Sequence, residues 1–202
     1  MQIIWEGKDV IKIIGDKNTI LINADKKSDA TVVLSQNLKE EDSNGAFIIS
    51  NPGEYEVNDD FFYVDLFTSK EGQKSLVYKI NVEDINIVDL NNINSQLELS
   101  TTENDSNNYE NIIDNKLDIL ILGIGEGFLS PKEAATIKNE LSPKIVIAIN
   151  YDLDSDKDVK RFHEFKASFV AISEPQDKFK ITKKNLPGPD DETMLIILNK
   201  VK

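Results

Sequence analysis

Residues 47–57 read Phe-Ile-Ile-Ser-Asn-Pro-Gly-Glu-Tyr-Glu-Val, and this stretch decides the expected fold. Its first three residues form a short apolar run of the kind that a buried strand needs. Asn51-Pro52-Gly53 has the composition of a turn, because proline fixes φ and glycine adopts a positive φ without steric penalty. The chain leaves the turn as Glu54-Tyr55-Glu56-Val57. On the residues alone we favour a corner of a β-sheet with two solvated glutamates over a catalytic role.

Before and shortly after this stretch the chain has the pattern of an all-β protein. Gly15-Asp16-Lys17-Asn18 predicts a hairpin turn, and Ser69-Lys70-Glu71-Gly72 predicts another. Runs rich in apolar and β-branched residues predict strands at 2–5, 10–14, 19–22, 29–34, 61–67, 75–82 and 85–92. The segment 94–115 is rich in Asn, Ser, Glu and Asp, so we expect a polar, mobile insertion there.

From Leu117 the pattern changes to alternating strands and helices. Ser130-Pro131-Lys132-Glu133 predicts a helix start, with serine as N-cap, proline at the first helical position and glutamate closing a capping box. A second helix is expected at 155–166. Strands are expected at 118–122, 144–149, 167–172 and 194–198.

Composition limits the classes of protein that this chain can belong to. Its 202 residues contain no long Pro/Gly/Ser linker, so we expect a single domain spanning 1–202. The formal charge of −13 and a single arginine, Arg161, make nucleic acid an unlikely ligand by composition. There is no cysteine, no signal-peptide pattern and no apolar run long enough for a membrane span. These features predict an acidic, cytoplasmic protein that binds no membrane.

Three segments resemble small bacterial zinc-dependent hydrolases of the metallo-β-lactamase fold. They are residues 47–57, with the Xaa-Pro-Gly turn and Glu-Tyr-Glu, residues 118–151, and residues 177–187. The resemblance implies an α/β fold in which two mixed sheets pack face to face with helices outside, the αβ/βα sandwich. It spans nearly the whole chain.

The same resemblance implies where metal ligands would lie. The family carries His-x-His-x-Asp-His after the fourth strand and His-Leu-Gly-Asp at the end of a later strand, where the aspartate bridges the metals. It also carries a further histidine before a tyrosine, and a histidine close to the metals in the first turn. The residues of this chain at those positions, the first loop being uncertain by one residue, are Lys8, Gln36, Leu38, Glu40, Glu41, Asp89, Asn92 and Asn150. Leucine cannot coordinate a metal, and amides are poor neutral ligands.

These replacements predict a degenerate, metal-free member with no catalytic residue and no cofactor. One histidine cannot build a zinc site, and we expect His163 on the surface of a helix. We therefore expect a binding or scaffolding role, with self-association or an unknown protein partner. Lys8 is expected near the loop 36–41, where its charge would offset part of the carboxylate repulsion.

Two alternatives remain open at the level of sequence. One is a hydrolase rebuilt around Mg²⁺ or Mn²⁺, with Glu40, Glu41, Asp42 and Asp89 as oxygen ligands. The other takes Gly123-Ile124-Gly125-Glu126-Gly127 as a phosphate cradle. That spacing is not G-x-G-x-x-G, and the predicted helix starts several residues later.

Overall fold

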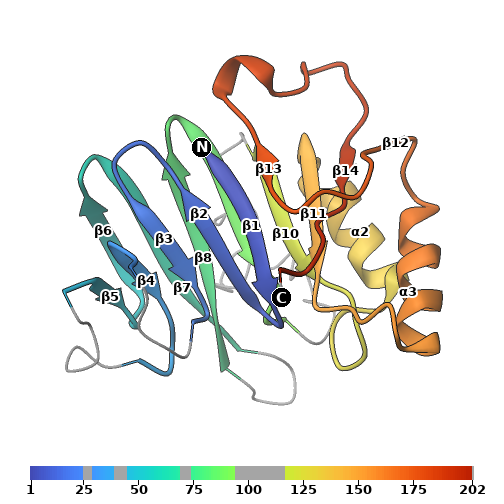
Figure 1. The fold of residues 1–202 in the computed structure, drawn as a ribbon, viewed down its shortest axis with the longest axis horizontal. Helices are drawn as coiled ribbons and strands as arrows, with labels where there is room; N and C mark the ends of the chain where they lie inside the picture. Colours follow the sequence, from blue (N-terminus) through green and yellow to red (C-terminus); the bar gives the residue numbers. More distant parts are fainter. Residues whose placement is uncertain (25–28, 39–44, 69–73, 94–116, 202) are drawn as a thin grey trace, which may run out of the picture.

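A computed structural model describes residues 1–24, 29–38, 45–68, 74–93 and 117–201. The segment 94–115, for which we expect a mobile insertion, lies outside these ranges, as do Glu40 and Glu41. Within the described part, two β-sheets pack against each other, and two helices lie against one of them (Figure 1).

Sheet A contains the first strands of the chain and one late strand. Its order is β13-β1-β2-β3-β4-β5. Neighbouring strands are antiparallel from β13 to β3 and parallel from β3 to β5. Their bounds are β1 Gln2–Gly7, β2 Val10–Ile14, β3 Thr19–Ile22, β4 Val32–Leu34, β5 Phe47–Ile49 and β13 Phe179–Lys180. The turn expected after β2 is confirmed, since the Gly15 N–H donates to the Asn18 carbonyl.

Sheet B has the order β12-β14-β11-β10-β9-β8-β7-β6 and is also mixed. From β12 to β9 the strands are parallel, and from β9 to β6 they are antiparallel. The bounds are β6 Gly53–Val57, β7 Asp60–Thr68, β8 Lys74–Val82, β9 Ile85–Leu90, β10 Ile119–Gly123, β11 Ile145–Ile149, β12 Ala171–Ile172 and β14 Met194–Ile196. The expectation of two mixed sheets is therefore confirmed.

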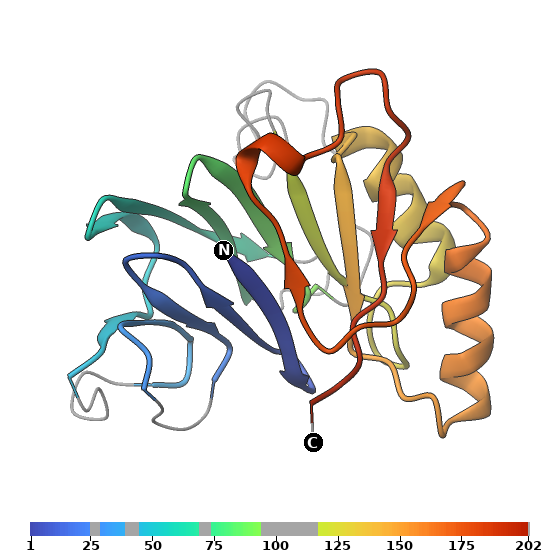
Figure 2. The same ribbon diagram turned by 45° about the horizontal axis from the view of Figure 1, so that its top comes forward.

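The helices begin where the sequence predicts. Helix α2 (Pro131–Leu141) has Ser130 as N-cap, and both hydrogen bonds of the capping box with Glu133 are formed. Helix α3 (Asp156–Lys166) begins after Ser155. Both helices pack beside β11, β14 and β12 (Figures 1 and 2). A short 3₁₀ helix, η2, spans Lys183–Asn185.

The strand expected at 167–172 is wrong over its first four residues. Ala167 is the C-cap of α3 in helical geometry, and the N–H groups of Ser168 and Phe169 donate to carbonyls of the last helical turn. Phe169 packs edge-on against Phe165, with ring centroids 5.1 Å apart. The apolar residues at 167–170 thus finish the helix, and the chain joins sheet B only at β12.

The core lies between the two sheets. Sheet A contributes fully buried isoleucines, and sheet B contributes Phe62, Ile80 and the all-buried strands β10 and β11. Trp5 contacts Tyr151, and Tyr151 stacks on Phe162 of α3, so aromatic rings link sheet A to the helical side of the molecule. Strands β5 and β6 are joined by the Asn51-Pro52 turn and belong to different sheets, so residues 47–57 form the expected corner.

Candidate functional site

The candidate site lies where β3, β9 and β11 end and where β1 turns into β2. Asn23 follows β3, Asn91 and Asn92 follow β9, and Asn150 follows β11. We call these four residues the asparagine cluster. Asn23 and Asn150 have φ of 58° and 59°. That left-handed region is one that asparagine tolerates better than most residues.

The asparagine cluster is connected by hydrogen bonds between amides. The Asn92 side chain donates to Asn23 Oδ1 at 2.8 Å, and the Asn23 side chain donates to Asn91 Oδ1 at 3.3 Å. Both Asn23 and Asn91 also donate to the Asp9 carbonyl at 3.3 Å. The Asn150 side chain donates to the Asn91 carbonyl at 3.4 Å. Asp9 and Asn23 follow strands of sheet A, and the other three asparagines follow strands of sheet B. This network therefore joins the two sheets.

Asp89 is the buried acid of the site, with a relative exposure of 2%. Its Oδ1 accepts from the Asn91 backbone N–H at 3.1 Å, and its Oδ2 accepts from the Asn91 side chain at 3.0 Å. Burial raises the pKa of Asp89 to about 7; the two bonds from Asn91 oppose that shift, and the nearby charge of Asp9 adds to it.

Tyr78 lies directly across the strand pair from Asp89. Its hydroxyl is buried and, in the described part of the chain, has no hydrogen-bond partner. Burial is the main cause that raises the pKa of Tyr78, with the charge of Asp89 second. The phenol therefore stays protonated at neutral pH and contributes no charge to the site.

Apart from Lys8, the positions predicted from the resemblance fall into three groups. Asp89, Asn92 and Asn150 come together in the network just described. Gln36 is exposed, and Leu38 is half-buried against a small apolar cluster of Leu21, Ala24 and Val33. Glu40 and Glu41 lie outside the described residues.

Lys8 was expected near the carboxylates of the loop 36–41. Its side chain is exposed in the turn between β1 and β2, and its carbonyl accepts a hydrogen bond from the Trp5 indole at 2.6 Å. Among the described residues Lys8 forms no ion pair with a carboxylate. The expected contact of Lys8 stays a prediction, because Glu40 and Glu41 lie outside the described residues.

Asn23, Asn91 and the Asp9 carbonyl are site groups that sequence reasoning missed. A signal was present, since all four cluster residues are asparagine and all four come within two positions of a strand end. Without side-chain directions, however, the pattern could not distinguish a network from ordinary strand-end turns.

The donor groups of this site do not suit zinc. Zinc is bound by imidazole, thiolate and carboxylate groups, usually three or more from the protein. Here the converging side chains are four amides and one carboxylate. Within the described ranges, no three His, Cys, Asp or Glu side chains group in a way that could hold a metal ion. His163 is exposed on α3, as expected.

The glycine-rich loop 123–127 is held by the protein itself. The Glu126 N–H donates to Asp158 Oδ1 at 2.7 Å, so a buried carboxylate of α3 occupies the place that a phosphate oxygen would need. Arg161 of the same helix donates to the carbonyls of Ile124, Phe128 and Leu129. These contacts favour a structural role for the loop over a phosphate cradle.

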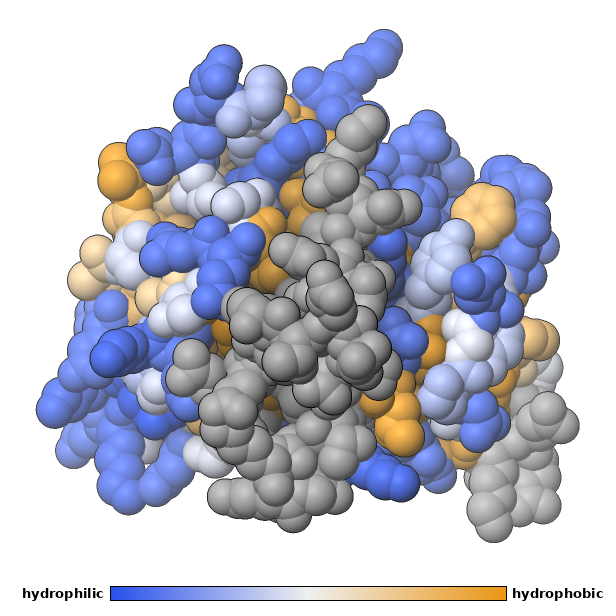
Figure 3. Space-filling view, turned by 180° about the vertical axis from the view of Figure 1, so that it is seen from behind, coloured by the Kyte–Doolittle hydropathy of each residue, from blue (hydrophilic) through white to orange (hydrophobic). Residues whose placement is uncertain are grey.

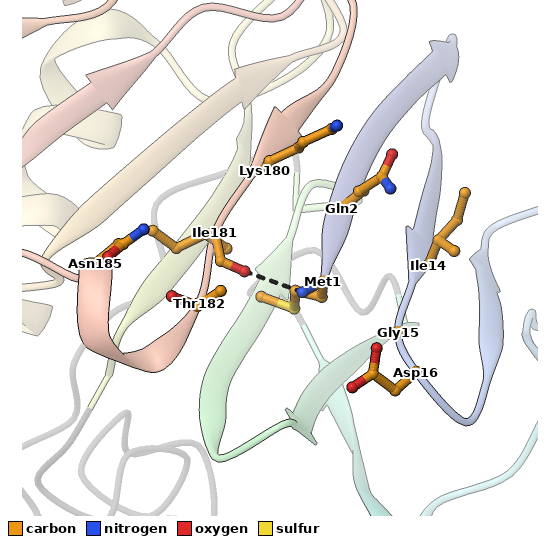
Figure 4. A pocket seen from close by; sticks show the side chains of 9 residues that line it. All are labelled: Met1, Gln2, Ile14, Gly15, Asp16, Lys180, Ile181, Thr182 and Asn185. Atoms are coloured by element: carbon orange, nitrogen blue, oxygen red, sulfur yellow. Dashed lines mark hydrogen bonds between the residues drawn. The ribbon is translucent and has the colours of Figure 1, made fainter.

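A cavity of about 510 Å³ lies at the other end of β1 and β2, away from the asparagine cluster. Figure 4 shows its lining, in which the Met1 nitrogen donates to the Ile181 carbonyl at 3.0 Å. Its polar side chains are Gln2, Asp16, Lys180, Thr182 and Asn185. None of the predicted site residues lines this cavity.

Comparisons with known proteins give the fold. No protein-family model matches the chain, and no curated protein does. Among solved structures, a zinc-dependent hydrolase of the metallo-β-lactamase superfamily from Thermotoga maritima is similar over 98% of both chains, with 20% identity and a TM-score of 0.72. The metallo-β-lactamase-fold protein YhfI from Bacillus subtilis is similar over 98% of this chain and 95% of its own, with 8% identity and a TM-score of 0.60.

A third structure, an isothiocyanate hydrolase from Delia radicum gut bacteria, is similar over 90% of this chain and all of its own, with 12% identity and a TM-score of 0.55. Together with the two mixed sheets and their strand order, these similarities show that the chain has the metallo-β-lactamase fold. Neither described helix is long or apolar enough for a transmembrane span.

Proposed function

We propose that this protein is a catalytically inactive, metal-free protein of the metallo-β-lactamase fold that acts by binding or scaffolding. One observation carries the proposal: the side chains that converge at the strand ends are amides that satisfy one another. An amide network of this kind leaves few lone pairs for a cation and supplies no negative charge beyond that of Asp89. The network also links the two sheets without any metal.

A hydrolase rebuilt around Mg²⁺ or Mn²⁺ is the competing proposal. Hard cations take six or more oxygen ligands, several of them carboxylates. In the described part of the site Asp89 is the one converging carboxylate, and both of its oxygens already accept hydrogen bonds from Asn91. Glu40, Glu41 and Asp42 lie outside the described residues. No contact among the described residues favours this second proposal.

The test is a turnover assay with phosphodiester, β-lactam and thioester substrates, each with zinc, manganese and magnesium. The expected result is no turnover above that of buffer containing the metal alone. Asp89→Ala and Asn150→Ala variants serve as controls, since a contaminating hydrolase is unaffected by either change. Turnover that the parent shows and that both variants lose would overturn the proposal and put the rebuilt hydrolase first.

A further inference from the structure

Strand β6 ends sheet B, and its outer edge pairs with no described strand. It forms a hairpin with β7 through Asn58 and Asp59, whose φ values of 52° and 64° are those of a type I′ turn. In such a hairpin the two residues that flank the turn, here Val57 and Asp60, form a hydrogen-bonded pair. Along the strands, hydrogen-bonded pairs then alternate with pairs that are not hydrogen-bonded. Tyr55 therefore bonds to Phe62, and the N–H and C=O groups of Glu54 and Glu56 point to the free edge.

The side chains of Glu54 and Glu56 are both exposed and form no ion pair with a described residue. By register they lie beside Tyr63 and Phe61 on the outward face of sheet B. Those two rings are 38% and 39% exposed. Where Figure 3 colours the surface seen from behind, that surface is mostly hydrophilic, with apolar residues in small groups. The outward side of β6 thus offers two unpaired negative charges next to aromatic rings.

The inward side of β6 is apolar. Tyr55 and Val57 are half-buried against the core, and Phe47 of β5 is 47% exposed and meets Tyr55 edge-on with centroids 6.2 Å apart. An open cavity of about 470 Å³ adjoins this edge and is lined in part by Phe47, Val57 and Asn58. Strands β5 and β6 lie at the same side of the molecule (Figure 1), and the apolar side chains of Phe47, Tyr55 and Val57 remain partly exposed there.

We propose that β6 is the docking edge for an extended segment of a partner protein in which basic and apolar residues alternate. The backbone of that segment would bond to Glu54 and Glu56 and add a strand to sheet B. Because strand side chains alternate between faces, its basic residues would meet the two glutamates, and its apolar residues would cover Tyr55, Phe47 and the cavity. The inference rests on the proposed binding role, and it identifies β6 as the surface through which that binding would occur.

The same geometry argues against a second copy of this chain as the occupant. Antiparallel pairing of two β6 strands about Tyr55 would place Glu54 of one copy directly opposite Glu56 of the other. Like charges directly opposite in a β-ladder are destabilising. The overall charge of −13 adds to the repulsion between copies. A basic partner is attracted by the same two features.

The probe is the peptide acetyl-Lys-Val-Lys-Val-Lys-Val-Lys-amide, titrated into the full chain while backbone amides are followed by NMR. We expect the largest shifts at the amides of Glu54 and Glu56, together with slower hydrogen exchange there. A peptide of the same composition with its lysines and valines in two blocks is expected to bind at least tenfold more weakly. Equal binding of both peptides would mean unspecific attraction to an acidic protein and would overturn the inference.

Charge reversal gives the matched variants. Glu54→Lys combined with Glu56→Lys is expected to lose the lysine peptide and to bind the corresponding glutamate peptide, which the parent does not bind. Glu174→Lys combined with Asp190→Lys changes the net charge equally. Glu174 follows β12 at the opposite edge of the sheet, and this control is expected to bind the lysine peptide within about twofold of the parent, since distant screened charges contribute little.

Three results would contradict the docking edge. They are shifts located elsewhere, no binding at millimolar peptide, or shifts at β6 that appear on raising the protein concentration without peptide, which would assign the edge to a second copy. Failure of the proposed function is separable from these, since metal-dependent turnover would be seen in the assay above whether or not β6 binds the peptide.

Discussion

Asn91 is the residue that connects most of the candidate site. It is fully buried, and its amide reaches Asp89 and the Asp9 carbonyl while accepting from Asn23. An amide can do this because it carries two donors and an acceptor in one group. A histidine or carboxylate at this place could not satisfy the same partners, so the network depends on the residue type and not on polarity alone.

Replacing Asn91 with alanine is expected to reduce the free energy of unfolding by about 2–3 kcal/mol, because several buried polar groups lose their partner at once. Asn92→Ala is the matched control. Asn92 is half-buried and its side chain donates one hydrogen bond, to Asn23, so its loss should cost about 1 kcal/mol. Urea unfolding measures both. Equal costs for the two variants would show that the network at Asn91 contributes little.

Asp89 is expected to give the stability a distinct pH dependence. Its folded pKa of about 7 lies above the unfolded value of about 3.9. The folded chain therefore binds this proton more tightly, so the contribution of Asp89 to stability falls as the pH rises from about 4 to about 7 and is constant above that range.

The comparison that isolates this effect is the difference between the parent and Asp89→Asn, measured by urea unfolding from pH 4 to pH 8. As the pH rises, the free energy of unfolding of the variant should increase relative to that of the parent, by at most about 1.4 kcal/mol per pH unit. This difference should level off above pH 7. Tyr78 and Asp9, the other titratable groups that act on this site, are unchanged in both proteins. A difference that does not vary with pH would refute the account of Asp89.

At this scale the sequence predicted residue types better than contacts. Asp89, Asn92 and Asn150 could be named because the resemblance aligned them with ligand positions at strand ends. Asn23 and Asn91 were not named, because the direction of an amide at a strand end depends on neighbours from the other sheet. The contact expected of Lys8 with the loop 36–41 stays a prediction, because Glu40 and Glu41 lie outside the described residues.

At the scale of elements, the loop 123–127 positions the end of β11. A Cβ added to Gly125 would lie 1.8 Å from the Asn150 carbonyl oxygen, so this approach requires glycine. Gly125→Ala must shift the backbone that carries Asn150, with an expected cost of about 1–3 kcal/mol or more. Thermal or urea unfolding measures it, and NMR shifts at Asn91 would report the disturbance of the network.

Gly127→Ala, two positions away, is the control for that change. A Cβ there meets open space, and only its φ of +88° is unfavourable, so the expected cost is about 1 kcal/mol with no shift at Asn91. If Gly127→Ala cost as much as Gly125→Ala and disturbed Asn91 equally, the close approach to Asn150 would not be what matters in this loop.

Element starts were the most predictable features of this chain. The capping box of α2 and the Pro-Gly corner at 51–53 rest on local chemistry, and both are present. The segment 167–170 was assigned to a strand because its apolar residues resemble one. Local hydrogen bonds and the contact between Phe165 and Phe169 keep it at the end of α3, and a single-sequence pattern does not contain that tertiary information.

At the scale of the whole molecule, amide hydrogen bonds at the strand ends connect the two sheets of this metallo-β-lactamase fold. Hydrophobic patterns and turn residues were sufficient to predict most of the strands and both helices, whereas the two packed sheets were predicted from the family resemblance. Which contacts each strand-end side chain would make could not be predicted as firmly, because their partners come from neighbouring strands and from the other sheet.

The most direct test is zinc analysis of protein purified without chelators, combined with its melting temperature with and without EDTA. The account predicts less than a tenth of an equivalent of zinc by that elemental analysis, and no change in melting temperature with zinc at tens of micromolar. A zinc site at one hundred times its dissociation constant would add about 2.7 kcal/mol, a shift of several degrees for a chain of this size. Stoichiometric zinc with a melting shift that EDTA reverses would contradict the account.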